Sequence, residues 1–213
     1  HSPQQPSHAD AILVTAKVTD PDGISSVRLL YQLVFPGNYI PAALPLNQSQ
    51  LNSNPSQPAK ENPAFEDPAN WVSVDMVDNA ASGDSTSGDG IYSALIPPQP
   101  HRTLVRYRIQ ASDQSLSQAS VQVPYADDPS FNFACFVYDG VPPYIPTDRT
   151  VHPDGLGHVY DATVMNSLPV YHLITRNVDM NQCMAYQAGF QIDKTNKVAR
   201  DLFNWEGAFI YDG

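Results

Sequence analysis

Residues 105–112 alternate strictly between apolar or aromatic side chains and polar or charged ones, and this alternation favours a β-rich fold. A period of two is typical of a strand with one buried and one solvated face. The stretch 90–96 predicts a preceding strand that ends at Pro97-Pro98, because proline has no N–H for sheet pairing. We expect these two strands to form a central hairpin. In its second strand the buried face would carry Val105, Tyr107, Ile109 and Ala111, and the solvated face Arg106, Arg108, Gln110 and Ser112.

Other alternating segments lie on both sides of this hairpin. The segments 11–19 and 26–35 flank the turn sequence Asp20-Pro21-Asp22-Gly23, so we expect them to form an antiparallel pair. Further strands are expected at 71–76, 121–124 and 131–138. About seven short strands with little helical periodicity are typical of an antiparallel β-sandwich with Greek-key connections. We therefore expect a mostly β protein whose sandwich covers residues 9–140.

Proline-rich and polar segments separate and flank the expected strands. The chain has 20 prolines among 213 residues, which favours short strands and rigid loops over long helices. Residues 1–8 are expected to be a flexible lead, residues 36–70 a long surface insertion without regular structure, and residues 141–167 a Pro/Gly/His-rich linker. Residues 168–213 contain expected strands at both ends but are too few to form a core of their own. They predict a small, incomplete α+β segment that either packs on the sandwich or belongs to a larger domain.

The charge balance excludes several classes of partner. With 22 acidic and 11 basic residues the net charge is −11, whereas nucleic acids and anionic membranes attract a basic surface. No run of about 18 apolar residues predicts a membrane span. The chain opens without a signal peptide, which we expect to have been removed or to lie outside this sequence. We expect a secreted, extracellular or cell-surface protein.

Aspartates at the ends of the expected strands give the best signal for a metal site. Calcium takes six to eight oxygen ligands, and loops at one pole of a sandwich can bring several carboxylates together. The alternative is that these residues form turns by accepting backbone N–H groups. Asp75 and Asp113 belong to the same set, but the candidate calcium ligands are Asp20, Asp22, Asp78, Asp84 and Asp89.

Two covalent features are predicted outside the aspartate loops. Cys135 and Cys183 would form one disulfide in a secreted protein, and the alternative is two buried free thiols. Asn47-Gln48-Ser49 is an N-glycosylation sequon.

Motifs for catalysis are absent from the sequence, which has no G-x-S-x-G elbow and no phosphate-binding glycine loop. A zinc or nickel site at His152, Asp154, His158 and Asp161 is a weaker hypothesis, because the spacing fits no standard ligand pattern. An N-terminal histidine such as His1 can chelate copper, and His8 lies nearby. Glycans are a further possible partner, since exposed tyrosines stack on sugars. The candidates for such a carbohydrate platform are Tyr39, Tyr144 and Tyr160.

Two resemblances to bacterial families add to this interpretation. Asp-Pro-Asp-Gly at 20–23, Gly-Asp-Gly-Ile-Tyr-Ser-Ala-Leu-Ile-Pro at 88–97 and Val-Arg-Tyr-Arg-Ile-Gln-Ala-Ser-Asp at 105–113 resemble immunoglobulin/fibronectin-III-like (Ig/FnIII-like) modules of secreted proteins. This resemblance covers roughly residues 9–138 and implies an Ig/FnIII-like sandwich.

The second resemblance lies toward the C-terminal end. Phe-Val-Tyr-Asp-Gly at 136–140, Leu-Pro-Val-Tyr-His-Leu at 168–173 and Gly-Ala-Phe-Ile-Tyr-Asp-Gly at 207–213 are similar to the entry of a CotH-like (spore-coat kinase) domain. That family resembles atypical protein kinases, but its catalytic and metal-binding residues come from later sequence. The resemblance therefore implies no catalytic residue here.

Together these observations predict a non-catalytic structural, adhesive or assembly module that contacts protein partners or its own copies through edge strands and terminal segments. The alternatives are the N-terminal portion of a secreted CotH-like kinase and a carbohydrate-binding module.

Overall fold

The computed structural model describes residues 1–44, 46, 50, 53–54, 56–58, 60–145, 159–181 and 206–211. It is mostly β, and all pairs of its named strands are antiparallel. The strands are β1 Ile12–Lys17, β2 Ile24–Val34, β3 Ala43–Leu44, β4 Lys60–Glu61, β5 Val72–Asp75, β6 Ile91–Ile96, β7 Leu104–Asp113, β8 Ser120–Val123, β9 Phe133–Phe136, β10 Tyr171–Ile174 and β11 Ala208–Tyr211. The helical turns are α2 Pro63–Glu66, η1 Pro68–Asn70 and α3 Ala162–Met165.

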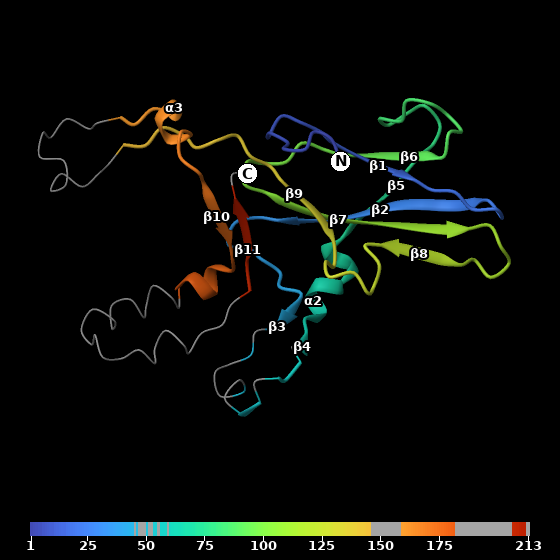
Figure 1. The fold of residues 1–213 in the computed structure, drawn as a ribbon, viewed down its shortest axis with the longest axis horizontal. Helices are drawn as coiled ribbons and strands as arrows, with labels where there is room; N and C mark the ends of the chain where they lie inside the picture. Colours follow the sequence, from blue (N-terminus) through green and yellow to red (C-terminus); the bar gives the residue numbers. More distant parts are fainter. Residues whose placement is uncertain are drawn as a thin grey trace, which may run out of the picture.

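The main core lies between two sheets. One sheet pairs β1 with β6, and the other has the order β5-β2-β7-β8, with β9 pairing the first half of β7 (Figure 1). The strand positions predicted from alternation are confirmed, because the inward residues of both sheets meet in one apolar cluster. Its buried members are Ile12, Val14, Val27, Leu29, Tyr31, Met76, Ala94, Ile96, Val105, Tyr107, Ile109, Ala111, Cys135 and Val137.

Both predicted strand pairs are wrong. The segment before Asp20 pairs with β6 and the segment after Gly23 pairs with β7, so the turn between them crosses from one sheet to the other. The predicted central hairpin fails in the same way, since β6 and β7 also lie in different sheets. Alternation predicts which side chains of a strand point into the core. It does not predict whether the next strand pairs with it in the same sheet or faces it from the other sheet, because the same residues point inward in both arrangements.

The N-terminal lead, expected to be flexible, makes hydrogen bonds to the sandwich. Ser2 exchanges two backbone hydrogen bonds with Leu13 at the edge of β1, at 2.8 and 2.9 Å. The carbonyl of the buried Pro6 accepts the N–H of Tyr138 at 2.8 Å. The N–H of His8 donates to Asp139 Oδ1 at 2.8 Å. These contacts join the lead to β1 and to the chain that leaves β9.

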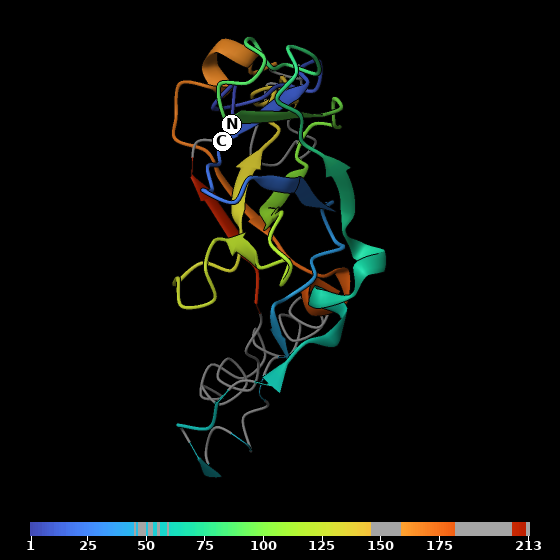
Figure 2. The same ribbon diagram turned by 90° about the vertical axis from the view of Figure 1, so that its right-hand side faces the viewer.

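The insertion at 36–70 contains regular elements and covers a sheet. Besides β3 and β4 it forms α2 and η1, whose N-caps are Asn62 and Asp67. These side chains accept N–H groups two residues ahead, an ordinary way to start a helical turn. In Figure 2 the teal α2 segment lies at one side of the strands. Two aromatic residues of the insertion, Tyr39 and Phe65, lie against the Arg106 guanidinium on β7.

The C-terminal strands form a separate antiparallel pair at the end of the sandwich where β7 begins (Figure 1). A second apolar cluster holds them there, formed by Val34, Leu104, Phe136 and Ile174 with Tyr39, Tyr138, Ala208 and Ile210 packed against it. Further contacts come from the insertion, because Asn177 N–H donates to the Gly37 carbonyl and Ala43 N–H to Glu206 Oε2. Residues 177–181 are helical. The described part of the C-terminal segment thus packs on the sandwich.

A search of the described residues finds no helix with the length and apolar character needed to cross a membrane.

Candidate functional sites

The β10–β11 sheet exposes an aromatic and apolar face. In register, Tyr171 lies opposite Tyr211 and Leu173 opposite Phe209. The ring centroid of Tyr171 is 5.3 Å from that of Tyr211 and 5.6 Å from that of Phe209. Their exposed fractions are 62%, 57% and 67%, and Leu173 is 62% exposed. We call these four residues the aromatic face.

The other face of the same sheet is also apolar. Its residues are His172, Ile174, Ala208 and Ile210, which contact the end of the sandwich. A sheet that carries large apolar residues on both faces is typical of a layer buried on both sides. The signal was present in the sequence, since 171–174 and 208–211 show no alternation of apolar with polar side chains. The sequence predicted strands there but did not identify the face.

The outer face of β7 carries two buried arginines that the alternation placed in solvent. Arg106 is 5% exposed and Arg108 6% exposed. Arg106 donates to Gln32 Oε1 at 3.0 Å and to the Ile40 carbonyl at 2.8 Å, and its guanidinium lies 4.6 Å from the Tyr39 ring centroid. Burial lowers the pKa of Arg106 and raises that of Tyr39. The prediction of a solvated face is therefore wrong at these positions, because the 36–70 insertion covers them.

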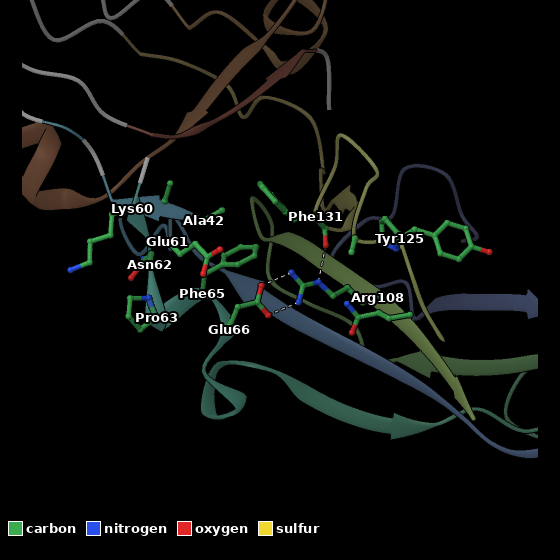
Figure 3. A pocket seen from close by; sticks show the side chains of 14 residues that line it. Ala42, Lys60, Glu61, Asn62, Pro63, Phe65, Glu66, Arg108, Tyr125 and Phe131 are labelled. Carbon is green, nitrogen blue, oxygen red and sulfur yellow. Dashed lines mark hydrogen bonds and ion pairs between the residues drawn. The ribbon is translucent and has the colours of Figure 1, made fainter. Parts of the chain in front are cut away.

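Arg108 has an ion-pair partner in addition to its hydrogen bond to the backbone and its contacts with aromatic rings. Its guanidinium donates to both carboxylate oxygens of Glu66, at 2.8 and 2.9 Å, and Nε donates to the Phe131 carbonyl at 2.8 Å (Figure 3). It also lies 4.5 Å from the Trp71 ring centroid and 5.3 Å from that of Phe65. The hydrogen bond from Arg108 holds the pKa of Glu66 below its usual value, against the opposing effect of burial. The ion pair therefore links α2, which carries Glu66, to β7, which carries Arg108.

A cleft lies beside this ion pair, between the insertion and the chain that follows β8 (Figure 3). Its lining residues include Phe65, Tyr125 and Phe131 together with the Glu66–Arg108 pair. At the rim, Lys60 and Glu61 carry opposite charges. The two positive and two negative side chains of the lining leave it without a formal net charge.

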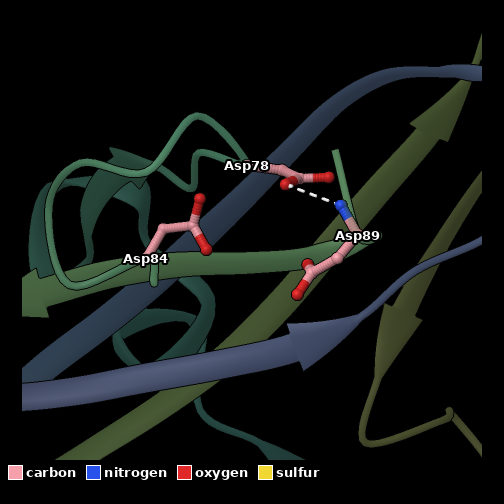
Figure 4. A group of neighbouring side chains, drawn as sticks. All are labelled: Asp78, Asp84 and Asp89. Carbon is pink, nitrogen blue, oxygen red and sulfur yellow. Dashed lines mark hydrogen bonds between the residues drawn. The ribbon is translucent and has the colours of Figure 1, made fainter. Parts of the chain in front are cut away.

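Three of the five predicted calcium ligands meet in the 78–90 loop. Carboxylate oxygens of Asp78, Asp84 and Asp89 lie within 4.8 Å of one another (Figure 4). Each also binds the backbone: Asp78 accepts the N–H groups of residues 88–90, Asp84 those of Ala80 and Thr86, and Asp89 that of Ile91. These bonds are the turn-forming role that the sequence left open. Calcium binding stays a prediction.

The other two predicted ligands lie outside this group. Asp20 Oδ1 accepts the N–H of Asp22 at 2.8 Å in the turn between β1 and β2. No described group of three potential ligands includes either residue. The structure thus brings together three of the five candidate ligands, and calcium binding at Asp20 and Asp22 stays a prediction.

The predicted covalent sites fall partly outside the described residues. Asn47 and Cys183 both lie there. Cys135 is a free cysteine in β9, 7% exposed, and burial raises the pKa of its thiol to about 11. The structure gives no support to a bridge at Cys135.

The weaker hypotheses have mixed outcomes. His152, Asp154 and His158 lie outside the described residues, and Asp161 instead caps α3 by accepting the Val164 N–H at 2.9 Å. Tyr144 and Tyr160 stack with ring centroids 6.5 Å apart, whereas Tyr39, expected to be exposed, is half-buried against Arg106. At the N-terminus, His1 Nδ1 lies 3.1 Å from the Tyr107 hydroxyl, and His8 pairs with Asp139.

Comparison of the chain with protein-family models, with curated proteins and with solved structures gives no match. The residues and their geometry are therefore what a functional proposal rests on.

Proposed function

We propose that this chain is a non-catalytic, extracellular assembly module that associates with further copies of itself through the aromatic face. The face is the observation that carries the proposal. At about 200 Å² for an aromatic side chain, its four residues expose on the order of 500 Å² of contiguous surface. A patch of that size is at the upper end for a monomer and approaches the ~800 Å² per partner of a standard interface.

The chemistry of the face favours a protein surface like its own. None of its four residues carries a charge, and two tyrosines supply hydroxyl groups at the edge of an otherwise apolar block. Two such faces can stack as the layers of a sandwich do, about 10 Å apart. The net charge of −11 on each copy opposes association, so the complex is expected to be weak at low salt and stronger when salt screens the repulsion.

A second candidate is that the face is covered by later sequence of a longer CotH-like kinase. The observation that favours it is the pairing of β10 with β11, because these strands come from two of the three stretches that carry the resemblance, 168–173 and 207–213. In that case the aromatic face is an internal surface of the kinase domain. The sandwich would then hold the domain rather than assemble copies.

Sedimentation of the purified chain at rising concentration separates the two candidates. Self-assembly predicts a concentration-dependent increase in mass that grows with NaCl and is lost in Leu173→Ser/Phe209→Ser. The matched control is Leu95→Ser/Leu116→Ser, which removes exposed apolar side chains elsewhere, at 41% and 108% exposure. This control is expected to associate as the wild type does.

A monomer at every concentration and salt level contradicts self-assembly. ATP binding by a longer natural form of the protein, together with a monomeric short chain, would support the kinase candidate.

A further inference from the structure

A histidine lies where the β10–β11 sheet meets the sandwich. The ring centroid of His172 is 5.0 Å from that of Phe136 and 5.2 Å from that of Tyr138. On β11 its neighbour in register is Ile210. Its Nε2 atom is buried and has no hydrogen-bond partner in the part of the chain that the structure describes. His172 is thus a titratable group in an apolar contact that joins two parts of the fold.

The groups of the sandwich whose charges act on His172 are a histidine and an arginine. His101 and Arg102 lie in the connection between β6 and β7, and their charges act on His172. The Tyr138 ring contacts both histidines, with its centroid 5.7 Å from that of His101 and 5.2 Å from that of His172. The nearby carboxylate of Asp139 contacts two other histidines: its Oδ2 lies 2.9 Å from His8 Nδ1 and 3.7 Å from His101 Nδ1.

The acidic groups of the C-terminal segment have other partners. Glu206, before β11, accepts the Ala43 N–H, and Asp179 pairs with Arg176 at 2.7 Å. The ion pairs of the described residues include none between His172 and a carboxylate. Among the described residues, no carboxylate therefore pairs with the His172 ring to neutralise a positive charge on it.

Protonation of His172 is unfavourable while the sheet is docked. An imidazolium needs acceptors for both of its N–H groups, and Nε2 has none, so protonation leaves a buried unpaired donor. The positive charge would also be repelled by Arg102. Burial first, and the charges of Arg102 and His101 next, lower the pKa of His172 below its usual value.

We propose that the contact around His172 is a pH-sensitive latch, which releases the β10–β11 sheet from the end of the sandwich in mildly acidic conditions. The direction follows from proton linkage. When the sheet is released, the His172 imidazole binds a proton with its ordinary pKa near 6.5, and when the sheet is docked the imidazole binds the proton less readily. Docking is thus strongest above about pH 6.5 and weakens as the pH falls toward the lowered pKa, by up to about tenfold in the opening equilibrium for each pH unit.

The latch does not depend on self-assembly, because it concerns contacts within one copy. Release of the sheet would also move the aromatic face, which lies on the opposite side of the same two strands. The two proposals can therefore fail separately.

Hydrogen–deuterium exchange of the full chain, at a concentration where it is monomeric, tests the latch. Exchange of β10 and β11 amides is compared at pH 7.5, 6.5 and 5.5 between wild type and His172→Phe, which cannot be protonated. Dividing the two rates at each pH cancels the intrinsic pH dependence of exchange. The wild-type sheet is expected to open up to about tenfold more per pH unit below 6.5 than the variant, while β2 and β7 change equally in both.

Two further variants keep the test decisive. His172→Gln replaces Phe if the larger ring disturbs docking, and it is also expected to abolish the pH-dependent opening. His8→Gln removes an exposed imidazole that contacts Asp139 and is expected to retain the opening of the wild type. Equal pH dependence in the wild type and in both His172 variants overturns the latch, as does a wild-type sheet that opens no more at pH 5.5 than at pH 7.5.

Discussion

Replacing Glu66 with glutamine tests whether the ion pair with Arg108 stabilises the cover over the five-stranded sheet. The two side chains share two hydrogen bonds at 2.8 and 2.9 Å. The Arg108 side chain is only 7% exposed, whereas that of Glu66 is 64% exposed. Removing the carboxylate charge therefore leaves a largely buried guanidinium without its counter-ion, which is the costly half of such a pair.

The expected destabilisation follows from these contacts. A hydrogen bond to a charged group contributes about 1.5–3 kcal/mol, and a glutamine would retain one neutral bond of about 1 kcal/mol. Because water screens the exposed Glu66 side, the net loss is smaller than the 3–5 kcal/mol of a fully buried pair. We expect Glu66→Gln to lower the free energy of unfolding by about 1–2 kcal/mol, or the melting temperature by roughly 2–8 °C.

Urea unfolding followed by tryptophan fluorescence measures this loss, since Trp71 packs near the Arg108 guanidinium. The matched control is Glu61→Gln, which removes an exposed carboxylate of the same cleft that has no ion pair among the described residues. It is expected to change stability by less than about 0.5 kcal/mol. Equal effects of the two variants would refute the assigned role of the pair.

The effect of Glu66→Gln should also depend on pH. Because the folded state lowers the pKa of Glu66 from its reference value of 4.5, the stabilisation is complete above about pH 4.5 and is lost as the pH falls through the lowered pKa. The difference between wild type and variant is therefore expected to shrink from pH 7 to pH 3. A constant difference would mean that the carboxylate charge contributes nothing.

Three other outcomes are expected. Asp78→Ala removes the acceptor of three backbone N–H groups and should cost about 2 kcal/mol in urea unfolding, whereas an unchanged midpoint would contradict that role. Because burial raises the pKa of Cys135 to about 11, its thiol should resist iodoacetamide at pH 8 until urea unfolds the chain, and peptide mapping detects the label. The calcium prediction is tested by melting in EDTA and in millimolar Ca²⁺: a rise that Asp89→Asn abolishes supports it, and identical temperatures contradict it.

The strands were predictable because alternation is local, but the partners of the strands were not. Ile12 and Val14 point into the core, as expected, and so do Val27 and Leu29. The same inward pattern fits a hairpin and a pair of strands that face each other from opposite sheets. Choosing between them requires knowing that the chain at 18–23 crosses the core, which a Pro/Gly turn sequence does not specify.

The candidate sites were predictable only in part, for a related reason. Arg106 and Arg108 were assigned to solvent because two residues of their cover, Tyr39 and Phe65, lie in a segment whose prolines and amides predict an irregular loop. Two large aromatic residues in such a polar segment were the available signal. Of the aspartates, those of the 78–90 loop meet because they share one loop, whereas Asp20 belongs to a different connection.

The crossings at 18–23 and 97–103 also affect how the chain can fold. Ile12 pairs with Ile96 and Lys17 with Ile91, so the two-stranded sheet forms only after most of the sandwich sequence has been synthesised. The long β2–β7 ladder likewise joins Val34 to Leu104. Of the strand pairs that line the main core, β7–β8 alone joins neighbours along the described chain, and it lies at an edge. Since such distant segments must meet before their contacts stabilise anything, the chain is expected to fold in milliseconds to seconds, and its incomplete sheets would expose strand edges to other chains in the meantime.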